Sequence, residues 1–93
     1  MITVVAKSVL KEDKVDEFKK LTEELIEETR KEKGCIDYAL YEDIENECTF
    51  TFIEKWEDMD CLKAHFESAH FKKIGLQVGK LRKSREINIY KEA

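Results

Sequence analysis

The sequence predicts an α+β fold of the ferredoxin-like split βαβ type, in which helices cover one four-stranded antiparallel sheet. Four segments are rich in β-branched residues or alternate apolar with polar residues, as strands do. Apolar residues recur with helical spacing after the first and after the third of these segments. The length of 93 residues suits one hydrophobic core, so we expect a single domain over residues 1–93.

The first half of the chain predicts one strand and one long helix. Residues 2–10 are rich in Val, Ile and Thr and form the expected first strand. Asp13 is predicted to cap the helix that follows, and Gly34 is predicted to end it in the left-handed conformation. The apolar residues of the helix fall on one stripe: Val15, Phe18, Leu21, Leu25 and Ile26.

A hairpin is predicted next, from residues 35–41 and 48–56 with a connection at 43–46. Alternation along its second strand places four side chains on one face: Phe50, Phe52, Glu54 and Trp56.

Two helical stretches and a last strand complete the expected fold. Asp58 is predicted to cap the first stretch, and Ser68 and Ala69 are predicted to break it. Residues 86–90 form the predicted fourth strand. The second stretch is identified by the helical spacing of its apolar residues: Phe71, Ile74, Val78 and Leu81.

Composition argues against two classes of partner. The net charge is -4, from 21 acidic and 17 basic residues, and the lysines are scattered rather than gathered in a stripe. A nucleic acid partner is therefore not expected, because phosphate backbones bind to clustered cations. No apolar run approaches the ~20 residues that a membrane span needs, so no membrane partner is expected.

Cysteine usage indicates a cytoplasmic location. Cys35, Cys48 and Cys61 form no CxxC pair, and their odd number leaves at least one free thiol. A reducing cytosol suits such thiols, and the first residues lack the charged start and long apolar stretch of a signal peptide.

Two segments resemble a known family. Gly34–Asp43 reads GCIDYALYED; Glu54–Asp58 reads EKWED and runs on to Leu62, Ala64, His65, Ser68, His70 and Phe71. Together they resemble the antibiotic biosynthesis monooxygenase family, including its quinol monooxygenase branch, and the resemblance extends from Val4 to Tyr90. It implies a dimeric α+β barrel, a homodimer whose two sheets pack face to face, with a pocket between sheet and helices in each protomer.

Several members of that family oxidise hydroquinones or polyketide phenols with molecular oxygen and with neither metal nor flavin. The resemblance thus implies a cofactor-independent monooxygenase whose partners are a small aromatic substrate, a quinol or phenol, and molecular oxygen. A deprotonated phenol is electron-rich enough to reduce oxygen directly. The protein then needs only a base, donors that stabilise an anion, and a dry cavity.

Glu54 and His65 are the candidate catalytic residues. Burial among aromatic side chains would raise the pKa of Glu54 and make it a usable base, whereas a structural hydrogen bond or salt bridge is the competing interpretation. His65 lies on the inward stripe of its helix, where it could accept a proton, although a lone histidine there is more often a satisfied core residue.

Seven further side chains are candidates for substrate binding. Trp56 could form an aromatic wall and donate its indole N–H, while His70 could act near the backbone amides at a helix start or serve only as a cap. A metal site from Glu54, His65 and His70 is not expected, because the two histidines are five residues apart across a helix break. The candidate substrate-binding residues are Trp56, His70, Tyr38, Phe52, Phe66, Phe71 and Asn88.

Other functions of this fold family remain open alternatives. Haem degradation is disfavoured, since Ala6 and Lys7 stand where related haem-degrading members need an asparagine, and Gly75 stands near the place of the axial histidine. A non-oxidative isomerase of a small hydroxyketone could use the same Glu54 and His65. A non-catalytic dimer that binds small molecules in a stress response is the third alternative.

Overall fold

The computed structural model describes residues 1–93, and its strands and α-helices follow one another in the predicted order. All neighbouring strands of the four-stranded sheet are antiparallel, which gives the expected ferredoxin-like α+β fold. No helix combines the length and the hydrophobicity that a membrane crossing requires. The elements are β1 (Ile2–Leu10), the 3-10 helix η1 (Glu12–Lys14), α1 (Val15–Thr29), β2 (Cys35–Glu42), β3 (Thr49–Trp56), α2 (Met59–Phe66), α3 (Ala69–Gly79) and β4 (Arg82–Lys91). The strand order in the sheet is β2-β3-β1-β4.

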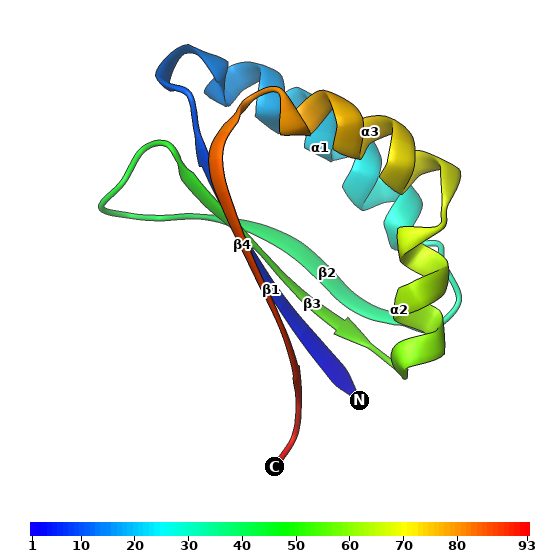
Figure 1. Ribbon diagram of the computed structural model, residues 1–93. Helices are drawn as coiled ribbons and strands as arrows, with labels where there is room; N and C mark the ends of the chain where they lie inside the picture. The colour runs from blue at the N-terminus through cyan, green and yellow to red at the C-terminus, as the bar shows by residue number, and fades with distance from the viewer.

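All three α-helices lie on one side of the sheet (Figure 1). The helices α1 and α3 run side by side, and α2 follows the end of β3. Alternation turns one face of each strand toward these helices, so the core forms between the two layers. Its buried apolar residues are Val4, Leu10, Phe18, Leu25, Tyr38, Phe50, Trp56, Leu62, Ile74, Val78 and Leu81.

The opposite face of the sheet carries no helix (Figure 1). It is not a purely polar surface. Val5 lies directly opposite Ile53 in the β1–β3 ladder, and Tyr41 and Tyr90 are exposed on the flanking strands. The sheet therefore presents apolar side chains to solvent on the side away from the core.

Helix boundaries follow from side-chain caps in two cases. Asp58 Oδ1 accepts a hydrogen bond from the Cys61 backbone N–H at 2.9 Å and starts α2, as predicted. Ser68 Oγ accepts from the Phe71 N–H at 3.3 Å, so Ser68 both separates the two helices and caps α3. Asp13, in contrast, lies within η1 and does not cap α1.

The turn between α1 and β2 differs from the prediction for Gly34. The helix already ends at Thr29, and Gly34, with φ of 81°, lies in the turn that leads into β2. A side chain at this position would collide with the Sγ of Cys61. Gly34 is thus required by a positive φ and by close approach to α2, not by the end of the helix.

The last strand is longer than predicted: it begins at Arg82 rather than at residue 86. Helix α3 is correspondingly shorter, since it ends at Gly79, before Leu81.

The ladder between β1 and β4 contains a β-bulge. Ser8 pairs with Arg85, but Leu10 pairs with Arg82, so β4 has one extra residue in this interval. Since Ser8 and Leu10 share a face of β1, the bulge turns both arginines toward the helices.

Candidate active site

A cavity of about 590 Å³ lies between the sheet and the helices. Ten of its 18 lining residues are hydrophobic, and its charged lining residues are Glu54, Lys72, Arg82 and Arg85. Such a largely apolar hollow with a few charged groups is the usual form of a small-molecule site. Its aromatic lining consists of Phe18, Tyr38, Phe52, Phe66 and Phe71.

Glu54 is a buried carboxyl group on the wall of this cavity. It is only 5% exposed, because β3 turns it toward the helices together with Phe52 and Trp56. The Nε1–H of Trp56 donates a hydrogen bond to Glu54 Oε1 at 3.0 Å, and no lysine or arginine pairs with this carboxylate.

The surroundings of Glu54 suit a general base. Burial raises its pKa to about 7, an effect that the charge of Glu32 supports and the Trp56 hydrogen bond opposes. A carboxylate with such a pKa can take a proton at neutral pH and release it again. Glu54 thus combines the two features that the sequence offers as alternatives: a hydrogen bond to a neighbour and a desolvated carboxyl at a cavity.

His65 is buried in α2 but does not line the cavity. It is 1% exposed and its ring lies 4.8 Å, centroid to centroid, from both Trp56 and Phe71. Its Nδ1 is 2.7 Å from Glu32 Oε2, so its partner is Glu32 rather than Glu54. Burial lowers the pKa of His65 despite the nearby carboxylate, which favours a neutral ring that donates its Nδ1–H to Glu32.

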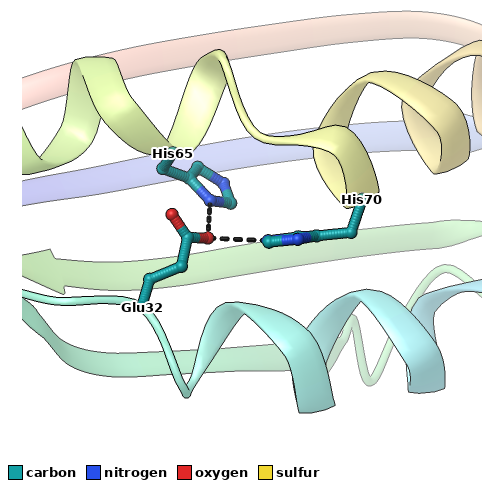
Figure 2. A group of neighbouring side chains, drawn as sticks. All are labelled: Glu32, His65 and His70. Atoms are coloured by element: carbon teal, nitrogen blue, oxygen red, sulfur yellow. Dashed lines mark hydrogen bonds and ion pairs between the residues drawn. The ribbon is translucent and has the colours of Figure 1, made fainter.

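His70 reaches the same carboxylate oxygen. Its Nε2 lies 2.8 Å from Glu32 Oε2, and Figure 2 shows the two imidazoles meeting on this one oxygen. Glu32 comes from the turn after α1, His65 from α2 and His70 from the first turn of α3. The cluster therefore ties three segments together. His70 does not line the cavity.

The prediction that the spacing of His65 and His70 keeps them out of one site was wrong. The break before α3 allows His65 and His70 to reach the same carboxylate, and this carboxylate belongs to Glu32 rather than to Glu54 (Figure 2). One atom from each residue lies within 4.8 Å of the others, a set that could offer a metal one oxygen and two nitrogens. Two hydrogen bonds already account for the arrangement, and a metal would require the donor nitrogens to lose their protons.

The other predicted residues divide between the cavity and its surroundings. Tyr38, Phe52, Phe66 and Phe71 line it. Trp56 is fully buried beside it and reaches it only through its hydrogen bond to Glu54.

Asn88 requires a correction. It pairs with Val5 and lies on the face of the sheet away from the helices, where its Nδ2–H donates to Glu86 at 3.2 Å. Three β4 residues face the cavity instead: Ile87 and Arg85 through regular alternation, and Arg82 because of the bulge. Asn88 is therefore not in a position to contact a ligand there.

Sequence reasoning missed Glu32 and the three cations of the cavity, Lys72, Arg82 and Arg85. Glu32 lies within the charged stretch from Arg30 to Lys33, which shows no periodicity that would single out one residue. The available signal for the arginines was the positively charged segment at residues 80–85, directly before the predicted fourth strand.

The comparisons with known proteins agree with this architecture. Residues 1–75 match the sequence profile described as antibiotic biosynthesis monooxygenase. A solved structure of a conserved protein from Methanosarcina mazei superimposes with a TM-score of 0.96; it is 46% identical in sequence, and the match covers 99% of this chain and 92% of that one.

Two curated relatives are each 38% identical to this chain. "Putative monooxygenase YcnE" of Bacillus subtilis aligns over 76% of this chain and 75% of its own length. "Uncharacterized protein sll1783" of Synechocystis aligns over 99% of this chain, which spans 63% of that relative's length. With a profile match over most of its residues and relatives at this identity, the chain belongs to the antibiotic biosynthesis monooxygenase family.

Proposed function

We propose that the protein is a monooxygenase that oxidises a small quinol or phenol with molecular oxygen and uses Glu54 as its general base. The observation that carries the proposal is the placement of this carboxyl, with a pKa of about 7, on the wall of an apolar and aromatic cavity. The family and the name of the Bacillus subtilis relative support the reaction class.

The proposed chemistry begins with proton transfer. Glu54 takes the proton of a substrate hydroxyl, and the phenolate formed passes electrons to oxygen. One oxygen atom forms a bond to a ring carbon, the other leaves as water, and a quinol becomes a hydroxylated quinone. Quinol and oxygen together contain all the atoms of these two products, so no further reductant is needed.

The surrounding residues would support this step without taking part in it. The aromatic rings of Tyr38, Phe52 and Phe66 would hold the substrate and exclude water. Trp56 would orient the carboxylate through its hydrogen bond. His65 has its Nδ1 engaged with Glu32 and lies outside the cavity lining, so we assign it a positioning role behind Trp56 and Phe71.

The proposal includes a homodimer formed through the open face of the sheet. Val5, Ile53, Tyr41 and Tyr90 on this face are partly or largely exposed in one protomer. A second copy would cover these apolar groups, and a chain this short gains from such burial because it covers only part of its own apolar surface.

Oxygen uptake tests the reaction. Metal-stripped protein is supplied with a panel of reduced quinones and phenols in an oxygen electrode, and the wild type is compared with Glu54→Gln. Loss of a general base is expected to lower the rate by roughly 10²- to 10⁴-fold. The exposed Glu57→Gln, three residues further on, is the control and should leave the rate unchanged. Uptake that never exceeds that of the Glu54→Gln variant, for every compound, would refute the proposal.

A further inference from the structure

Three cations line the cavity, although the whole chain carries a net charge of -4. Glu54 is the one acidic residue among the lining residues. Lys72 has an ion-pair partner outside the cavity lining, since its Nζ lies 3.0 Å from Glu67 Oε2. Arg82 and Arg85 make no ion pair and no side-chain hydrogen bond. Arg85 is solvent-exposed, whereas Arg82 is half-buried, so it is the missing acceptor of Arg82 beside a second cation that calls for a physical reason.

The β-bulge supplies the geometric part of that reason. Residues three apart on a regular strand point to opposite faces of a sheet. In β4 the bulge brings Arg82 opposite Leu10 and Arg85 opposite Ser8, so both arginines face the cavity. Bulges often redirect side chains near functional sites. The paired placement of the arginines is therefore specified by the backbone of this strand.

The burial of Arg82 supplies the energetic part. Its Nε is buried and has no hydrogen-bond acceptor, and burial together with the charge of Arg85 lowers its pKa. A buried donor without an acceptor costs free energy, and a charged one costs more. An acceptor with negative charge, held by both guanidinium groups, would remove this cost, because the planar fork of arginine matches carboxylate, sulfonate and phosphate oxygens.

We propose that Arg82 and Arg85 bind the anionic group of an aromatic ligand whose rings occupy the cavity. This assignment rests on the proposed function only in taking the cavity as the substrate site. The anion and the reacting hydroxyl would lie at opposite ends of the ligand. Glu54 pairs with Val4 and Arg85 with Ser8, which are four residues apart on β1, or about 13 Å. The favoured substrate class is thus an aromatic acid with its phenol remote from the acid group.

A matched pair of fluorescent probes tests the anion site. Anilinonaphthalene sulfonate and its neutral parent, phenylnaphthylamine, differ only in the charged group, and both are titrated under argon. Arg82→Gln and Arg85→Gln are each expected to weaken binding of the sulfonate by about 10-fold, the loss of one charged hydrogen bond, and binding of the neutral probe by less than about twofold. Lys83→Gln changes an exposed lysine between the two arginines and should alter neither affinity.

Each outcome decides the assignment. Equal weakening of both probes would mean that the variants disturb the cavity itself, and unchanged sulfonate binding would mean that the arginines do not hold the anion. Absence of sulfonate binding to the wild type would equally overturn the proposal. The titration involves no turnover, so a protein that binds the sulfonate as expected but consumes no oxygen would refute the proposed function and leave the anion site standing.

Discussion

Trp56 donates its indole N–H to Glu54 Oε1 at 3.0 Å, and both side chains are buried on the same face of β3. The hydrogen bond stabilises the ionised carboxylate, whereas the apolar surroundings stabilise the protonated form. The pKa of Glu54 therefore reflects a balance that one neighbour on the same strand can alter.

Replacing Trp56 with Phe should raise the pKa of Glu54, because the donor that favours the anion is lost while burial remains. The ascending limb of the pH–rate profile for oxygen uptake is then expected to move to higher pH. Tyr41→Phe, on the open face of the sheet, is the control. An unshifted limb in a folded Trp56→Phe protein would contradict the assigned role of the indole.

The buried Glu54 should also make stability depend on pH. Its pKa is about 7 in the folded protein against an ordinary value of 4.5, so between these pH values the folded state keeps a proton that the unfolded chain releases. The free energy of unfolding should therefore fall as pH rises through this window, by as much as a few kcal/mol.

Urea unfolding of the wild type and of Glu54→Gln at pH 5 and pH 8 measures this effect. The variant has no proton to release, so the difference between the two proteins isolates Glu54 from His65, whose lowered pKa acts in the opposite direction. A difference that stays constant between the two pH values would show that Glu54 titrates normally.

Glu32→Ala should destabilise the fold by about 2 kcal/mol or more, because it leaves the buried Nδ1 of His65 without a partner and releases His70 as well. Glu28→Ala removes an exposed partner of Lys31 nearby and should cost less than about 0.5 kcal/mol. Thermal unfolding of both variants provides the comparison. Similar melting temperatures of the two variants would mean that the cluster of Glu32, His65 and His70 contributes little to the packing of α2 and α3.

Gly75 allows stability and binding to be separated. A methyl group at this position meets no atom within 4 Å, and the residue lies inside α3 on the cavity wall. Gly75→Ala should stabilise the protein by roughly 0.5–1 kcal/mol through helix propensity. Gly75→Leu should remain folded but weaken probe binding, since its side chain extends into the cavity. Probe affinity that is equal in the Leu variant and the wild type would place the ligand elsewhere.

Ile53→Lys tests the proposed dimer. A charge in the middle of the open sheet face should prevent a second sheet from packing on it, and analytical ultracentrifugation should then find a monomer. Gln77→Lys adds the same charge on the exposed surface of α3, away from the open face, and controls for charge alone. A wild type that is itself monomeric at micromolar concentration would exclude this interface.

The regular parts of the fold could be predicted from the sequence because alternation and helical spacing are local properties. The face of β3 that carries Phe50, Phe52 and Glu54 follows from alternation alone. The cap at Asp58 was equally visible, since its side chain acts within one helical turn.

The parts of the site that escaped prediction depend on departures from regular geometry. Arg82 and Arg85 share a face only because of a bulge, which alternation cannot indicate. Glu32 acquires its role from the direction in which α3 leaves α2, a tertiary relationship without a local signature. Asn88 is different, because regular alternation with Ile87 already places it on the face of β4 away from the cavity.

The pairing of Ile2 with Lys91 brings the two ends of the chain to the same corner of the molecule (Figure 1). Arg82 stands at the other end of the ten-residue strand β4, about 30 Å away. An affinity tag or a fused reporter joined at either terminus would thus emerge far from the arginines. Immobilising the protein by its ends should leave the charged side of the cavity open to solution.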